Sequence, residues 1–151
     1  MINYFTLPEI HIMTESEIIL VKRSWVMIRS VDPVIVGDLF YSKLFSDQPA
    51  LRKMFPKEMN EQYTKLLNMI NTIIARLDKI DEMTDEIAAM ARRHVDYGVR
   101  PAHYKKVGKA LIWTIKNGLG NDWTPELENA WNKCYNSLMN FMINVSELKS
   151  T

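Results

Sequence analysis

The stretch "MARRHVDYGVRPAHY", residues 90–104, decides the fold of this chain. Its first half continues a helical pattern in which Ile87, Ala91 and His94 recur at steps of three or four residues. Gly98 then ends that helix, and a proline three residues later opens the next one. His94 therefore lies in line with apolar positions that should face the core. Either its imidazole is hydrogen-bonded to a buried neighbour, or it binds something.

Helix signals also dominate the rest of the chain, and no convincing period-two strand pattern appears. Two kinds of signal mark where helices begin: the capping box "TESE" (14–17), and a capping residue followed directly by a proline. We expect helices over residues 14–30, 33–45, 57–77, 84–97, 101–117 and 124–145, and a short helical turn after Ser46. The chain then forms one all-α domain of seven or eight helices over residues 14–148. An N-terminal extension (1–13) and a C-terminal tail (149–151) flank this domain.

Composition excludes several classes of function. The 151 residues carry a net charge of +1 and no basic run with interleaved aromatic residues, so nothing points to nucleic acid. No apolar run reaches membrane-spanning length, and no secretory signal opens the chain. A single cysteine, Cys134, forms neither an intrachain disulfide nor a thiolate metal site, and a closed zinc site is not expected. These features predict a reducing, cytoplasmic location.

Polar residues on apolar faces are the candidates for function. Gln62 lies beside the apolar stripe of the 57–77 helix, Tyr41 adds a phenol near the same interior, and Phe55 lies in an irregular passage. Each has an ordinary explanation as a core or edge residue, and so does His94. Together they indicate a shared ligand, because one imidazole supplied from a helix end is the usual protein donor to haem iron.

Several motifs in one order resemble the globin family, in particular bacterial single-domain globins and the haem domain of flavohaemoglobins. They run from Trp25 to the last helix, and the resemblance covers residues 14–145. Gln62 and His94 are 32 positions apart, as expected between the distal and proximal positions of this class. The motifs that carry the resemblance are "FYSKLF" (40–45), "PALRKMF" (49–55), "RRHVDYGVRPAHYKKVG" (92–108) and "AWNKCY" (130–135).

The resemblance implies a globin fold enclosing one haem b. His94 would be the iron ligand, Phe55 would pack on the porphyrin, and Val99 would touch its edge. Lys65 and His103 could each reach a haem propionate, although a solvated lysine and a local helix cap are the ordinary alternatives.

On the distal side, the resemblance implies that Tyr41, Gln62 and Leu66 face the bound gas. It also places Gly37 where globins need a small residue for a close helix crossing. Tyr63 departs from the pattern, because relatives usually have a small residue or proline there. Either the distal helix is displaced, or Tyr63 enters the pocket and Gln62 swings out.

The proximal side also departs from the flavohaemoglobin pattern. Those haem domains pair the histidine with a tyrosine and a late glutamate, which raise the basicity of the imidazole. Tyr104 matches the tyrosine, but the glutamate position falls on Ser146, with Glu147 one residue off. A weaker electronic push on the iron is the expected consequence.

The implied function is reversible binding of oxygen, NO and CO. Hydrogen bonds from Tyr41 and Gln62 to a ligand with partial negative charge would each contribute about 1–3 kcal/mol. The pair would then slow oxygen release by about one to four orders of magnitude, which suits NO detoxification better than bulk transport. A separate reductase would restore ferrous iron, because the chain ends at Thr151 without a reductase domain. We expect an open or water-filled sixth position on the iron.

Two alternatives stay open at this point. The first is a haem-based gas or redox sensor that acts through a separate partner protein. The second is a helical interaction domain without a cofactor. In every case we expect a monomer or weak dimer.

Overall fold

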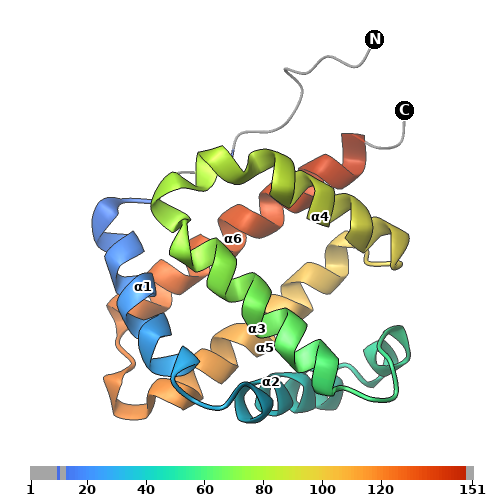
Figure 1. Cartoon of the computed structure of the whole chain (residues 1–151), viewed down its shortest axis with the longest axis horizontal. Coiled ribbons are helices and arrows are strands. Elements are labelled where there is room, and N and C mark those ends of the chain that lie inside the picture. The colour runs from blue at the N-terminus through green and yellow to red at the C-terminus, as the bar shows by residue number, and fades with distance from the viewer. Residues whose placement is uncertain (1–9, 11–12, 149–151) are drawn as a thin grey trace.

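The computed structural model describes residues 10 and 13–148, and within them every regular element is helical (Figure 1). The all-α expectation is confirmed. The elements in chain order are α1 (Glu15–Arg29), α2 (Pro33–Asp47), the 3-10 helix η2 (Pro49–Met54), α3 (Asn60–Ala75), the 3-10 helix η3 (Leu77–Met83), α4 (Thr84–Asp96), α5 (Pro101–Leu119), the 3-10 helix η4 (Gly120–Asp122) and α6 (Pro125–Leu148).

The flanking segments fall largely outside the described residues. Of the expected extension 1–13, the structure describes Ile10 and Met13, and both are buried in the core. The expected tail 149–151 is not among the described residues. No helix in the described part of the chain combines the length and apolar character needed to cross a bilayer.

Local side chains set where the helices begin and end. The Thr14 hydroxyl accepts a hydrogen bond from the Glu17 backbone N–H at 3.2 Å, and the Glu17 carboxylate accepts one from the Thr14 N–H at 2.9 Å. Asp32 caps α2 by accepting from the Val34 N–H at 2.9 Å. At the other end of the fold, Gly98 follows α4 with a φ of +88°, a backbone conformation that favours glycine.

Glu17 also joins α1 to α6, and this contact predicts an acid dependence of stability. Its carboxylate lies 2.7 Å from the Lys133 ammonium. The hydrogen bond from Lys133, followed by that from the Thr14 backbone, lowers the pKa of Glu17 from 4.5 to about 2. Because the folded-state pKa is lowered, the stabilisation is complete above the unfolded-state pKa and is lost as the pH falls through about 4.5 toward 2.

We therefore expect Glu17→Gln to reduce the loss of stability between about pH 6 and about pH 3. Urea unfolding midpoints of the variant and the parent at both pH values measure this. Equal losses in the two proteins would contradict the role of Glu17.

The helix expected from residue 57 begins three residues later, at Asn60. The cause is Arg52, whose guanidinium donates to the backbone carbonyls of Phe55 (3.3 Å), Pro56 (3.0 Å) and Lys57 (3.1 Å). Those three carbonyls face Arg52 outside any helix, so the chain between η2 and α3 stays irregular.

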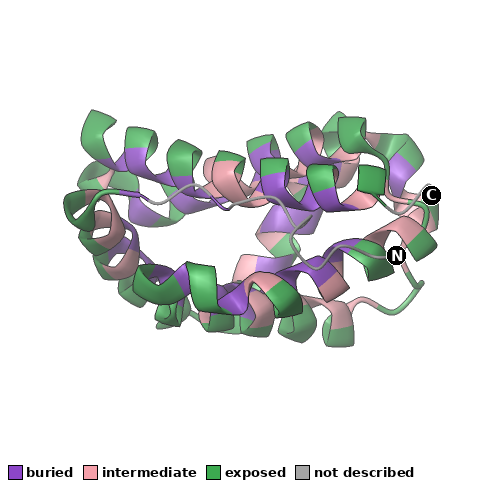
Figure 2. Cartoon of the chain, turned by 90° about the horizontal axis from the view of Figure 1, so that it is seen from above, coloured by how far each residue is buried: buried purple, intermediate pink, exposed green. Residues whose placement is uncertain are grey.

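The buried residues lie on the sides of the helices that face one another across the interior (Figure 2). In the view of Figure 1, α3 overlies α5 and α4 overlies α6. The larger core includes Trp25 and Trp131, whose rings are 6.1 Å apart. Each indole N–H has a partner, Asn71 at 2.6 Å for Trp25 and Ser24 at 2.9 Å for Trp131. Burial without an unpaired N–H lets both indoles stabilise this core.

A second, smaller core lies around α2. Its buried members are Phe40, Tyr41, Leu44, Leu51 and Ala110. Leu66 on α3 and Leu111 on α5 contact both cores, yet each is only half-buried. The interior therefore consists of two cores, which meet at these two leucines.

Candidate functional site

His94 lies in the last turn of α4 and is half-buried, although Ile87 and Ala91 on its stripe are fully buried. Its Nδ1 is 2.7 Å from the backbone carbonyl oxygen of Met90. A carbonyl only accepts, so Nδ1 carries a proton, and in the neutral imidazole Nε2 then presents a lone pair. An imidazole held in this tautomer by its own helix is ready to bind a metal ion through Nε2.

A polar pair joins α2 and α3. Gln62, near the start of α3, donates from Nε2 to the Tyr41 hydroxyl at 3.1 Å. Tyr41 is 4% exposed, and burial raises the pKa of its phenol, so the hydroxyl keeps its proton at neutral pH. Because the phenol oxygen accepts from Gln62, its own O–H remains available to donate to a further group.

Tyr63 lies against α2. Its ring stacks on Tyr41 at 5.7 Å between centroids, and its hydroxyl donates to the Asp38 carboxylate at 3.3 Å. The start of the side chain rests directly on the Gly37 backbone, where any Cβ would overlap it. In this structure Tyr63 fills the crossing of α2 and α3, while Gln62 contacts Tyr41.

Gly37→Ala is expected to disturb this crossing. The new Cβ would lie 2.5 Å from the Tyr63 Cβ, so α2 and α3 must separate. Such overpacking costs about 1–3 kcal/mol, more than the helix gains on replacing glycine by alanine, about 0.5–1 kcal/mol. The free energy of unfolding from urea titration measures the loss.

Gly118→Ala is the matched control within α5. A Cβ at that position meets only the flexible end of Ile28, at 2.6 Å, which can move aside. We expect this variant to be as stable as the parent or slightly more so. If Gly37→Ala leaves the free energy of unfolding unchanged, the close crossing of α2 and α3 does not contribute to stability.

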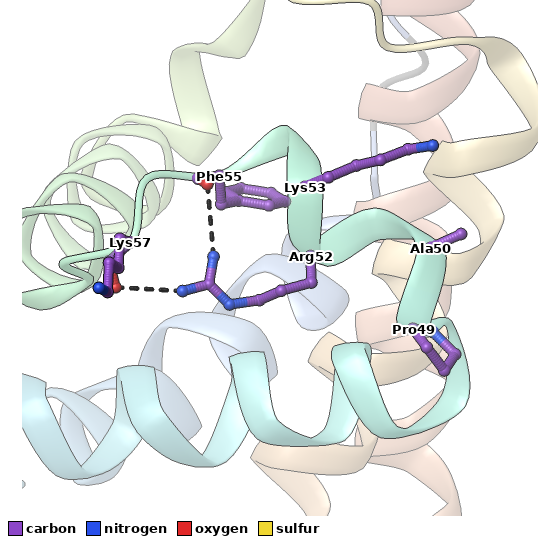
Figure 3. A pocket seen from close by; sticks show the side chains of 6 residues that line it. All are labelled: Pro49, Ala50, Arg52, Lys53, Phe55 and Lys57. Atoms are coloured by element: carbon purple, nitrogen blue, oxygen red, sulfur yellow. Dashed lines mark hydrogen bonds between the residues drawn. The ribbon is translucent and has the colours of Figure 1, made fainter.

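The aromatic residues around Tyr41 form one cluster. The Phe55 ring lies 5.3 Å from Tyr41 and 5.5 Å from Phe45. Arg52 donates to the Phe55 carbonyl and lies 5.4 Å from the centroid of the Phe45 ring, which packs against Phe55. Figure 3 shows this clamp beside a shallow surface hollow, with Arg52 directed at the carbonyls of Phe55 and Lys57.

The remaining candidates lie around the ends of α4 and α5. The buried Tyr104 ring is 6.3 Å from the His94 ring and inclined by 25°. Val99 is half-buried, and its N–H donates to the His94 carbonyl at 2.9 Å. His103 caps α5, since its Nδ1 accepts from the Arg100 N–H at 2.9 Å. Lys65 is exposed on α3.

The late position where a glutamate is expected carries Ser146, followed by Glu147. The Ser146 hydroxyl donates to the Ile143 carbonyl of its own helix at 2.6 Å, and Glu147 is exposed. The partner of His94 in the described residues is the Met90 carbonyl, with Tyr104 packed alongside.

These residues fit a flat cofactor that carries its own metal ligands. No cluster of three or more His, Cys, Asp or Glu side chains in the described part of the chain could hold a metal ion, so His94 would be a single protein ligand. Apolar positions that should be buried are half-exposed at the junction of the two cores, at Leu66 and Leu111, and beside the larger core at Met90. An apolar plate would cover this surface, and His94 would hold its metal through Nε2.

Sequence reasoning missed Arg52 and Asp38. The hydrogen bonds of Arg52 go to backbone carbonyls, which leave no mark in the sequence. Asp38 accepts from Ser42 on its own helix, but its contact with Tyr63 reaches 25 residues along the chain to another helix. An exposed aspartate one position after Gly37 is the only local hint of that contact.

Comparisons with known proteins agree with the fold. A sequence model described as Globin matches residues 38–142. A flavohemoprotein of Bacillus subtilis (strain 168) is 29% identical over 130 residues, covering 80% of this chain and 33% of that protein. The chain thus spans about a third of the length of the flavohemoproteins it matches.

Two further relatives match over nearly their whole length. An uncharacterized globin-like protein of Aquifex aeolicus (strain VF5) is 29% identical over 135 residues, covering 89% of this chain and 96% of that protein. The structure of a bacterial globin from Campylobacter jejuni superposes with a TM-score of 0.77 at 24% identity. It covers 91% of this chain and all of the other. The expected fold class is confirmed.

Proposed function

The chain belongs to the globin family, and from this premise we propose that it binds oxygen, NO and CO at a haem b whose iron is held by His94. The observation that carries the proposal is the position of the proton on the His94 imidazole. The Met90 carbonyl fixes the proton on Nδ1 and leaves the Nε2 lone pair free for a metal.

A bound haem would supply an iron atom with an open coordination position for a diatomic gas. The chain's own residues would then set the affinity. The Tyr41 hydroxyl is buried, protonated and oriented by Gln62, so it can donate to a ligand with partial negative charge at little cost in reorganisation. Phe55, held by Arg52, would form one apolar wall of the cofactor site, and Val99 another.

Tyr63 supports the pair formed by Tyr41 and Gln62 through its contacts with α2. Its ring packs on Gly37 and Tyr41, and its hydroxyl is bonded to Asp38. This packing fixes the rotation of α3 and so directs the neighbouring Gln62 toward Tyr41. Tyr63 is therefore a positioning residue rather than a ligand donor.

The reaction we propose is NO detoxification. Oxygen and NO combine to nitrate with the uptake of one electron, NO + O₂ + e⁻ → NO₃⁻, so each turnover needs a reductant. We propose that a reductase supplies this electron.

Stopped-flow mixing of the reduced, haem-loaded, oxygen-saturated protein with NO tests the reaction. We expect rapid conversion to the ferric spectrum and one nitrate for each NO consumed. The same mixing with protein saturated with CO in the absence of oxygen is the control, and it should yield no nitrate. Slow conversion without nitrate would remove the enzymatic part of the proposal and leave gas binding intact.

A further inference from the structure

The positive charge of this chain is concentrated in one segment. Residues 92–109 contain six Lys or Arg and one Asp, a net charge of +5. The whole chain carries +1, so the remaining residues carry −4. We call the six cations the basic face. They are Arg92, Arg93, Arg100, Lys105, Lys106 and Lys109.

These side chains are open to a partner. Five are exposed, and Lys106 is half-buried. Within the described part of the chain, none of the six forms a salt bridge with an acidic side chain. None of the six is therefore held in an ion pair within the described protein, although Asp96 lies in the same segment and Glu128 lines one hollow with Lys105 and Lys109. The segment keeps an excess of positive charge.

The basic face lies on either side of His94 and Tyr97 along the chain. It occupies the end of α4 and the first half of α5, joined by residues 97–100 (Figure 1). Tyr97 lies between these cations, is 67% exposed, and has its ring 6.2 Å from the His94 ring. Arg93 is one helical turn before Tyr97, so the two share a side of α4.

Arg100 and Lys106 extend the same surface at the start of α5. Both lie close enough to His103 to lower its pKa, after the larger effect of burial. His103 is consequently neutral at physiological pH and adds no charge of its own. The positive charge of the face is carried by the arginines and lysines.

We propose that the basic face is the docking site of a small acidic one-electron redox protein that reduces the iron on the His94 side. The inference rests on the proposed haem function, which needs an electron in every turnover. Complementary charge brings redox partners together quickly without a large interface, which suits transient electron transfer. The exposed Tyr97 ring, between Arg93 and Arg100 in the chain, offers an apolar contact and lies beside His94.

A redox protein fits these observations better than a nucleic acid does. Tyr97 is the one strongly exposed aromatic ring in the described residues, so no row of stacking platforms accompanies the cations. The net charge of −4 on the rest of the chain would repel an extended polyanion, whereas a small acidic partner contacts only one side.

Reduced flavodoxin, an acidic one-electron flavoprotein, is a suitable probe. Stopped-flow reduction of the ferric, haem-loaded chain is followed at low ionic strength, about 0.01 M, and at about 1 M, where charges are screened within about 3 Å. The test variant carries Arg93→Glu and Lys105→Glu. The control carries Lys116→Glu and Lys79→Glu, which change the net charge equally away from the basic face.

At low ionic strength we expect the test variant to be reduced about tenfold more slowly than the parent, and the control by no more than about twofold. The difference should vanish at high salt. Arg93 and Lys116 both lie in the last turn of a helix, so both variants place a glutamate near a helix C-terminus.

Three outcomes would overturn the proposal. They are equal slowing in the two variants, a parent rate that does not depend on salt, and no reduction of the parent by flavodoxin. Salt-dependent binding of RNA or anionic vesicles through Arg93 and Lys105, with unchanged flavodoxin rates, would also count against it. Dithionite is the control that separates these results from failure of the proposed function, because it reduces haem without a protein partner. If no ferrous spectrum appears after dithionite, the proposed haem binding itself is refuted.

Discussion

His94→Ala is expected to abolish tight haem binding. The substitution removes the single protein ligand that the described residues offer to the iron, and no nearby cluster of His, Cys, Asp or Glu can replace it. The fold should survive, because His94 is half-buried and its hydrogen bond is to its own helix. Far-ultraviolet circular dichroism should be unchanged while the Soret band is lost or greatly weakened.

His103→Ala provides the matched control. This residue also lies at the α4–α5 corner, but its Nδ1 is used to cap α5. We expect His103→Ala to keep the Soret band with a small loss of stability. Addition of free imidazole to His94→Ala should restore a six-coordinate or histidine-like spectrum. Unaltered spectra in His94→Ala would show that another residue binds the iron.

Tyr41→Phe should speed oxygen release by about tenfold to a hundredfold, because a hydrogen bond to a charged acceptor is worth about 1.5–3 kcal/mol. The ring itself is retained, so the contacts with Phe55 and Tyr63 persist. Flash photolysis or stopped-flow displacement of oxygen by CO measures the rate. A change of less than about twofold would mean that the phenol does not face the ligand.

Gln62→Leu should speed release less, by about twofold to tenfold, because the Gln62 amide donates to Tyr41 in this structure. If Gln62 acts through Tyr41, its replacement has little further effect in a Tyr41→Phe background. The double-mutant cycle therefore distinguishes two donors in series from two independent donors. Additive effects would indicate that Gln62 contacts the ligand directly.

The helical organisation could be predicted from the sequence because its signals are local. The capping box at Thr14, the Asp32 cap and the Gly98 stop each act within a few residues, and each is present in the structure. The start of α3 could not be predicted in this way. It depends on Arg52 holding three carbonyls of the following segment, and nothing in residues 57–60 records that contact.

The candidate site shows the same limit. His94 could be identified because its position on an apolar stripe follows from helical spacing alone. The orientations of Gln62 and Tyr63 could not be predicted. The two residues are neighbours on α3, and only the crossing angle with α2 decides which way each of them points. That crossing depends on the contact of Tyr63 with Gly37, 26 positions earlier in the chain.

The central proposal is that the chain holds one haem through His94, and titration of the full chain with haemin tests it most directly. Absorbance in the Soret region should rise linearly and break sharply at one haemin per chain, and reduction under CO should then give a single CO-bound species. A shallow rise without a break, indistinguishable from that of His94→Ala, would contradict the account.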